Sequence, residues 1–337
     1  MPTISIILLV LGVFLLFFVW AELFSTVFVI GGGAGPQSRW VADRLWRLAL
    51  KLHTPSSQKS HSRMRAVGPG IVLLALATWV FEIVLAWTLI FQPSVFKEPD
   101  GVSFSDRFVF AGKSIIGRSG NTPALEVDGA WWEMIQGFAG LTGVVVISVG
   151  LAYVLPILAA VAQKRSVASS LHAIGDSVNS MYECGTTDKG KAYHEHLLAM
   201  VPQIALSAER HRSYPVLHYF HSSDPHAALA PAVAKVGLLF HADLSELPEL
   251  TDTVTEPVAH SIHNLLEALG GMGLRRYARE ADTIDRDKLN ELDIDPRVPP
   301  PATRLPNIEW LKAYVQFDGW EWDTIKDETG ETPGLNL

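Results

Sequence analysis

Three long apolar runs constrain this chain more than any other feature. They cover residues 4–30, 67–92 and 134–162 of the 337-residue sequence; the first two contain one charged residue each, and the third contains none. Each run exceeds the roughly 20 residues that cross a ~30 Å hydrocarbon core at about 1.5 Å per residue. The sequence therefore predicts an α-helical membrane protein with three transmembrane helices. The first run is expected to be an anchor and not a signal peptide, because no positive residue precedes it and no small-residue cleavage site ends it.

The charges between the runs predict the orientation. Residues 31–66 carry seven Lys and Arg residues against one acid, Asp43, so the positive-inside rule puts this loop in the cytoplasm. The N-terminus is then outside, the loop 93–133 is extracytoplasmic, and the part after Lys164 and Arg165 is a cytoplasmic domain. A net charge of −8 without a dense basic patch argues against nucleic-acid binding. The single cysteine, Cys184, excludes an intrachain disulfide and a cysteine-based zinc site.

The segment between the second and third runs contains an unusual motif, FVFAGKSIIGRSGNTPA at 108–124. Its apolar part is too short to span a membrane but suits a half-helix, which Ser103 or Ser105 would cap and Gly117 would end. The following RSGNTP is rich in residues that favour turns with unusual backbone angles. A helix, a half-helix, a glycine turn and a second helix follow one another as in a re-entrant pore loop, whereas the simpler alternative is an external hairpin.

On these residues the chain resembles the pore-loop (potassium-type) ion channels, and within them the bacterial two-pore-domain-like members. Laid over the family pattern TVGYGD-x-x-P without gaps, IIGRSGNTP at 115–123 places Gly117 on the first filter glycine and Pro123 on the proline after the filter. The segments AELFSTVF, LAYVLPILAAVAQKRSVASSLHAIGDS and HRSYPVLHYFHS look like the flanking parts of those bacterial proteins. The likeness touches most of the chain.

The filter departs from the family pattern in its side chains. Ile115 stands where the family has a threonine whose hydroxyl helps to form the innermost ion site, and Arg118 stands at the tyrosine position. Ser119 replaces the second glycine and Gly120 the aspartate. A second register pairs Gly117 with Gly120, and the sequence does not choose between the two. Rings of Arg118 or Lys113 side chains would disfavour cations strongly if they faced the axis.

The resemblance implies a homotetramer in the bacterial inner membrane that passes monovalent cations, potassium above all, through rings of backbone carbonyls. The expected ion pathway consists of Ile115, Ile116, Gly117, Arg118, Ser119, Gly120 and Asn121. The rival interpretation is a non-conducting channel homologue that acts as a membrane sensor or scaffold through its cytoplasmic domain. An enzyme is not expected, because no ordered nucleophile and base are found, and no cofactor motif is present.

Two acids lie within the apolar runs, and such residues are functional candidates by default. Glu22 is near the basic loop and is expected to reach water or an arginine, whereas Glu82 is nearer the middle of its span and is expected to face helices or a wet cavity. A hydrogen-bonded packing role and a role in gating or permeation both remain open for the two acids.

The third run contains small residues and a proline that serve either close helix packing or bending of a gate. The gating candidates are Gly140, Gly143, Gly150 and Pro156.

The expected organisation has four parts. Residues 1–66 form the first helix and a basic linker, and 67–163 form the helix–pore-loop–helix unit. Residues 164–295 form a cytoplasmic all-α domain, and 296–337 form a Pro-rich connector with an acidic, Trp-bearing tail.

Two further features of these parts bear on partners. The stretch WVADRLWRLALKL in the linker is amphipathic and basic and is expected to contact membrane lipids. The histidines of the domain, among them His211, His218 and His221, form no zinc signature and are expected mainly to satisfy the core, so no metal is predicted.

Overall fold

The computed structural model describes most of the chain. The described residues are 2–29, 34–118, 125–187, 190–247, 250, 252–290, 305–327, 332 and 335. They divide into two compact units: unit 1 comprises 1–29, 34–39 and 72–156, and unit 2 comprises 30–33, 40–71 and 157–337. Within the described ranges the structure is almost entirely helical, and the only β pairing is one antiparallel bridge between Phe96 and Val127.

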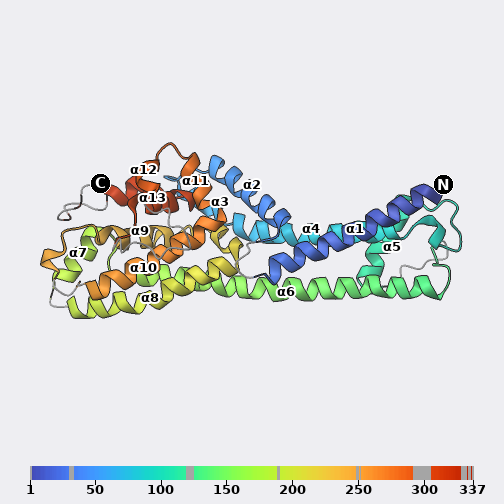
Figure 1. Cartoon of the computed structure of the whole chain (residues 1–337), viewed down its shortest axis with the longest axis horizontal. Coiled ribbons are helices and arrows are strands. Elements are labelled where there is room, and N and C mark those ends of the chain that lie inside the picture. Colours follow the sequence, from blue (N-terminus) through green and yellow to red (C-terminus); the bar gives the residue numbers. More distant parts are fainter. Residues whose placement is uncertain are drawn as a thin grey trace. The chain divides into compact units, whose positions relative to one another are not determined.

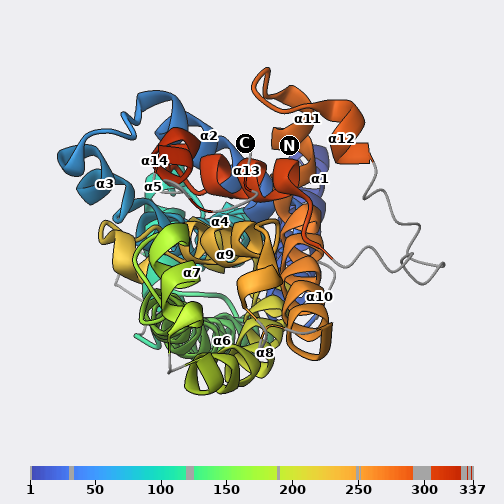
Figure 2. The same cartoon turned by 90° about the vertical axis from the view of Figure 1, so that its left-hand side faces the viewer.

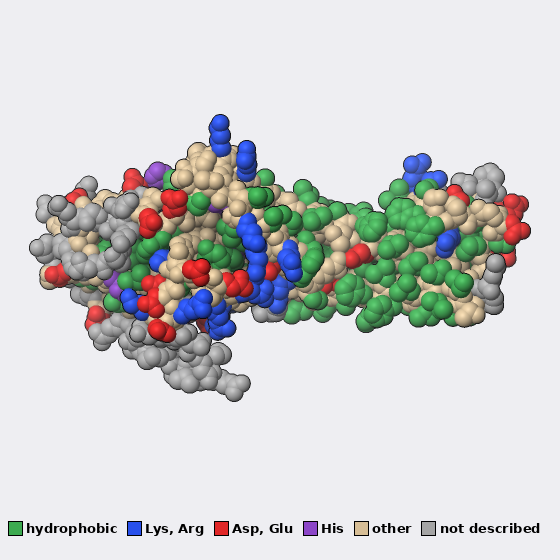
Figure 3. Space-filling model, turned by 90° about the horizontal axis from the view of Figure 1, so that it is seen from above, with side chains coloured by type: hydrophobic (Ala, Val, Ile, Leu, Met, Phe, Trp, Pro, Cys, Tyr) green, Lys and Arg blue, Asp and Glu red, His purple; other side chains and the backbone are tan. Residues whose placement is uncertain are grey.

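Three helices are long and apolar enough to cross a membrane, as the sequence predicts: Thr3–Val27, Gln58–Ile90 and Ala130–His172. In finer detail they are α1 (Pro2–Val27), α3 (Gln58–Met64) followed by α4 (Val67–Ile90), and α6 (Ala130–His172). Large apolar side chains on α1 point outward, for example Phe14 and Phe17, and hydrophobic side chains cover much of the surface of unit 1 in Figure 3. Such a surface requires a lipid or protein environment.

Unit 1 contains α1, α4, η1 (Pro93–Val95), α5 (Phe104–Ile115) and the first part of α6. Figure 1 shows α5 between α4 and α6. The core is aromatic: the ring of Phe110 in α5 packs edge-on against Phe91 and Phe96, with centroids 5.0 Å apart in both pairs. Gly12 allows α1 to approach α4 closely, since a Cβ there would lie 2.8 Å from the carbonyl oxygen of Ala86.

Unit 2 is built around α9 (Leu229–Leu239), all of whose residues are buried. Figure 2 shows α9 among α7, α10 and α13, and α9 contacts each of these helices. The other helices of the unit after α6 are α7 (Val178–Thr186), α8 (Gly190–Ser213), η2 (Pro215–Tyr219), η3 (Pro225–Ala227), η4 (Leu244–Glu246), α10 (Asp252–Leu269), the π-helical η5 (Gly270–Leu274), α11 (Arg275–Glu280), α12 (Arg286–Asn290), α13 (Ile308–Phe317) and α14 (Trp322–Asp327).

Two segments outside the predicted cytoplasmic domain of 164–295 contribute to the core of unit 2. The basic linker contains α2 (Pro36–Leu52), and its Trp46 is fully buried and donates a hydrogen bond from Nε1 to the carbonyl oxygen of Phe317, at 3.1 Å. The acidic, Trp-bearing tail contains α13, in which Leu311, Tyr314 and Val315 are also fully buried. The compact units thus divide the chain differently from the four predicted parts.

Candidate functional site

The candidate pore-loop segment begins with a well-formed helix cap. Ser103 accepts a hydrogen bond from the backbone N–H of Asp106, and the carboxylate of Asp106 accepts one in return from the N–H of Ser103, at 3.0 Å. The helix ends at Ile115, and Gly117 follows with φ of +74° in the left-handed region that favours glycine. Ser103 as the cap and a turn at Gly117 are therefore as the sequence predicts.

The C-terminal end of α5 packs directly on the glycines of α6. A Cβ at Gly143 would lie 2.0 Å from the carbonyl oxygen of Ile115, and a Cβ at Gly140 would lie 3.1 Å from that of Ser114. Gln136 in α6 also donates to the hydroxyl of Ser114, at 3.1 Å. Gly140 and Gly143 therefore permit a close approach between the backbones of α5 and α6. Close helix packing is one of the two roles that the sequence predicts for these glycines, and gating is the other.

The remaining filter and gating candidates have different environments. Ile115 is buried, whereas Ile116, Gly117 and Arg118 are exposed on the single chain. Ser119, Gly120 and Asn121 lie outside the described residues. Gly150 faces Leu76 of α4, with a Cβ-to-side-chain distance of 3.2 Å, and Pro156 lies inside the continuous helix α6.

The two acids of the candidate spans, Glu22 and Glu82, are brought together by the start of α2. Glu22 is buried and its carboxylate accepts hydrogen bonds from the backbone N–H groups of Gln37, at 3.3 Å, and Ser38, at 2.8 Å. The side chain of Gln37 in turn donates to Glu82, at 2.5 Å. The positive end of a helix is thus a partner of Glu22. Gly35 makes room for this arrangement, because a Cβ there would lie 2.5 Å from the carboxyl group of Glu22.

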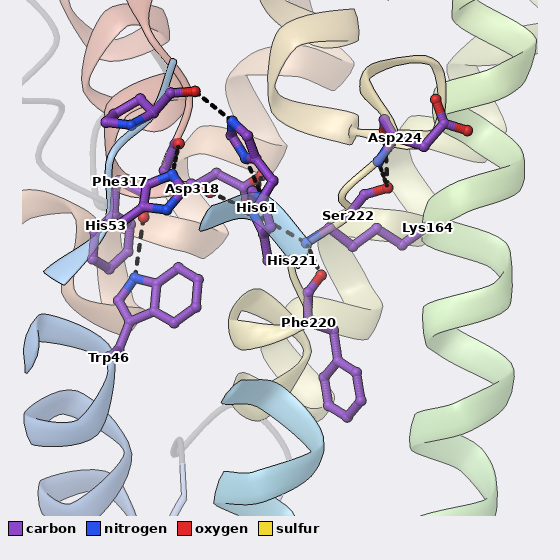
Figure 4. A network of polar contacts seen from close by, with 12 residues as sticks. Trp46, His53, His61, Lys164, Phe220, His221, Ser222, Asp224, Phe317 and Asp318 are labelled. Carbon is purple, nitrogen blue, oxygen red and sulfur yellow. Dashed lines mark hydrogen bonds and ion pairs between the residues drawn. The ribbon is translucent and has the colours of Figure 1, made fainter. Parts of the chain in front are cut away.

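Unit 2 contains a buried polar cluster that joins distant parts of the chain (Figure 4). Lys164 of α6 and Asp318 at the end of α13 are both buried, with Nζ 3.6 Å from Oδ1, and Lys164 also donates to the carbonyl oxygen of Phe220, at 3.2 Å. His221 lies beside them, with Nδ1 2.8 Å from the carbonyl oxygen of Asp318. Burial raises the pKa of Asp318 to about 6 although Lys164 opposes the shift, and burial lowers the pKa of His221 to about 3.

A pair of histidines extends this cluster toward α3. The Nδ1 of His61 is 2.9 Å from Nε2 of His221, and Nε2 of His61 is 2.6 Å from the carbonyl oxygen of Pro55. The two carbonyl oxygens, of Pro55 and Asp318, only accept, and the contact between the rings requires one further proton. The three contacts therefore need three ring protons, whereas two neutral imidazoles supply two.

His53 completes the cluster without such a deficit. Its Nε2 donates to the carbonyl oxygen of Gly319, at 2.8 Å, and its Nδ1 is 2.7 Å from the hydroxyl of Ser60. Gly319 has φ of +89°, which turns the chain after α13. Sequence reasoning missed His53, His61, Lys164 and Asp318 as a group, because they come from four separate segments. No group of three His, Cys, Asp or Glu in the described part of the chain is arranged to hold a metal ion.

The fold and these sites define an α-helical membrane protein with three candidate spans and a helical unit that encloses the buried polar cluster. The chain is 27% identical over 239 residues to the uncharacterized membrane protein YdjJ of Bacillus subtilis (strain 168), an alignment that covers 67% of this chain. The chain spans only 65% of the length of that relative. No family model matches the sequence, and no solved structure matches it.

Proposed function

We propose that the chain is one subunit of a homotetrameric pore-loop ion channel of the bacterial inner membrane. Four copies would surround an axis, and monovalent cations, potassium in the first place, would pass through backbone carbonyls of the segment around Gly117. The N-terminus would lie outside and unit 2 in the cytoplasm. A helical membrane fold is compatible with many functions, so the proposal depends on the position of α5.

The observation that carries the proposal is the depth at which α5 ends. The helix starts beside the end of α4, where Arg107 Nη1 lies 3.5 Å from the carbonyl oxygen of Thr88. It finishes against Gly143, which is roughly 20 Å along α6 from Ala130 at about 1.5 Å per residue. A segment that enters from one end of two spans and stops near mid-depth fits a re-entrant half-helix. Non-helical backbone is tolerated there only where protein or water covers it.

An unfilled apolar groove on unit 1 fits assembly into an oligomer. It has a volume of about 510 Å³ and lies between α4 and α5. Its lining consists of Leu76, Ala77, Val80, Phe81, Val84, Phe108 and Gly112. In a tetramer, a helix of a neighbouring subunit would fill this groove.

A specific contact favours a second candidate, a non-conducting homologue that works as a sensor or scaffold. The carbonyl oxygen of Ile115 packs against Gly143 and so is directed at α6 of its own chain. A carbonyl in that position does not line an axis. The altered filter residues Ile115 and Arg118 agree with this alternative.

Ion flux from liposomes that contain the purified full chain would test the proposal, with potassium, sodium and chloride compared. Gly117→Ala places a side chain at φ of +74° and is expected to abolish potassium flux. Gly129→Ala is the matched control, since Gly129 also has positive φ (+88°) and free space around a Cβ, but lies outside the filter segment. Flux that survives Gly117→Ala would exclude this filter, and a folded tetramer without flux of any ion would favour the sensor.

A further inference from the structure

Helix α2 presents a continuous exposed stripe on one face. Trp40, Leu48 and Leu52 are 60%, 54% and 76% exposed, and Arg44, which is exposed too, lies between them. These positions are four residues apart and therefore share a side of the helix. The opposite side carries the buried residues Ala42 and Trp46. Large apolar groups of this kind are costly to expose to water in a continuous stripe.

The same stripe carries positive charge that no acid of α2 neutralises. The guanidinium of Arg44 lies 5.3 Å from the ring centre of Trp40, and Lys51 is exposed beside Leu52. Asp43, the one acid in the helix, is held by ion pairs with Arg47, at 3.1 Å, and with Arg276 of α11, at 3.2 Å. Farther along, α3 and its C-cap add exposed cations, namely Lys59, Arg63 and Arg65.

The connections of α2 lead to candidate spans on both sides along the chain. Its first turn is bound to the carboxylate of Glu22, which is little more than one turn from the end of the apolar helix α1 at Val27. At the other end, α3 runs to Met64 and α4 starts at Val67. Candidate spans therefore precede and follow α2 along the chain.

From these observations we propose that α2 is an interfacial helix that binds anionic phospholipids. Trp40, Leu48 and Leu52 enter the boundary between headgroups and acyl chains, and Arg44 and Lys51 contact lipid phosphates. Apolar and cationic side chains on one exposed face, next to a span, have the character of a helix lying in the interface. Figure 3 shows Lys and Arg side chains gathered on the face of the molecule that carries α2 and α3.

Titration of the full chain in detergent with short-chain phosphatidylglycerol, phosphatidylcholine and inorganic phosphate would test this proposal. Phosphatidylglycerol is expected to bind more tightly than the other two, and Arg44→Gln and Lys51→Gln are each expected to weaken it about fivefold. The pair Arg279→Gln and Lys288→Gln removes the same charge from exposed positions in α11 and α12 and is expected to change nothing. Equal weakening by both pairs would overturn the proposal.

A second readout locates the stripe independently of affinity. With Cys184→Ser as background, an environment-sensitive dye at Leu48→Cys is expected to shift to the blue in vesicles of phosphatidylglycerol and phosphatidylcholine, compared with phosphatidylcholine alone. The same dye at Thr186→Cys, an exposed position in α7, is the control. A shift that depends on protein concentration and not on lipid charge would mean that a second copy covers the stripe, and would overturn the proposal.

Discussion

The rings of His61 and His221 are stacked at 12° with their centroids 5.1 Å apart, and they share one hydrogen bond between Nδ1 and Nε2. Each ring uses its other nitrogen on a carbonyl oxygen, so the pair has one proton fewer than its contacts can use. Burial opposes the uptake of this proton. The titratable groups that face the pair are His53, Lys164, Asp318 and Glu321.

The buried histidines predict that unit 2 loses stability in acid. Burial lowers the pKa of His211 and His221 from 6.5 to about 3, and that of His218 well below 6.5. Below pH 6.5 the unfolded chain therefore binds protons that the folded unit does not, and the free energy of unfolding decreases by up to ~1.4 kcal/mol per pH unit for each histidine. Asp318 has a raised pKa and therefore acts in the opposite direction between pH 3.8 and about pH 6. It offsets the effect of only one of these three histidines. Thermal unfolding as a function of pH measures the net slope.

A variant at His218 separates this effect from general acid denaturation. The ring of His218 stacks on Phe317 with centroids 4.2 Å apart, and neither of its nitrogens makes a well-formed hydrogen bond. His218→Phe is expected to keep the packing and to make the pH slope shallower, because one of the buried histidines that oppose protonation is removed. His226→Gln, at a position that is 61% exposed, is the control and should leave the slope unchanged. Equal slopes in both variants would contradict a contribution of His218 to the loss of stability in acid.

The ion pair of Lys164 and Asp318 is expected to be sensitive to the loss of one partner. Lys164→Met leaves Asp318 buried without its cation, which costs about 3–5 kcal/mol at a pH where the carboxyl group is ionised. Adding Asp318→Asn removes the unpaired charge and should recover much of that loss. Chemical unfolding of both single variants and of the double variant measures the coupling, and strict additivity would show that the two groups do not interact.

The glycines of α6 allow a matched test of the contact with α5. Gly143→Ala brings a Cβ to 2.0 Å from the backbone oxygen of Ile115, and moving that backbone is expected to cost about 3 kcal/mol. Gly137→Ala in the same helix meets nothing within 4 Å and should stay within ~1 kcal/mol of the wild type. Unfolding in mixed micelles compares the two, and similar stabilities would rule out this packing.

Glu22 is expected to act as the cap of α2. Glu22→Ala removes the acceptor of two backbone N–H groups and should cost about 1–2 kcal/mol. The local signature is faster hydrogen exchange at Gln37 and Ser38. Glu98→Ala, at an exposed acid, serves as the control, and unchanged exchange in Glu22→Ala would argue against the cap.

The sequence predicts features that depend on near neighbours better than those that depend on distant ones. The three spans follow from length and hydropathy, and Ser103 and Gly117 follow from helix-capping rules that act over a few residues. The partner of Glu22 lies 15 residues away in the first turn of α2, and no local pattern indicates it.

The sequence does not predict the buried polar cluster either, because its members are far apart along the chain. His61 and His221 are 160 residues apart. Closely spaced histidines stand out only in the predicted cytoplasmic domain, to which His221 belongs and His61 does not. His53 and His61 precede the second apolar run and look like ordinary polar residues of a basic loop. The contact between His61 and His221 joins α3 to the segment after η2, which periodicity alone does not reveal.

The hydrogen bond from Trp46 to Phe317 also sets an order of events during synthesis. The two residues are 271 positions apart, so at about 5–20 residues per second a ribosome needs roughly 15 to 50 s to make the acceptor after the donor. During that time the first two spans are already available for insertion, while the indole of Trp46 has no site to occupy. Unit 2 can close only when α13 arrives, and a nascent chain stalled before α13 would present Trp46 to chaperones and proteases.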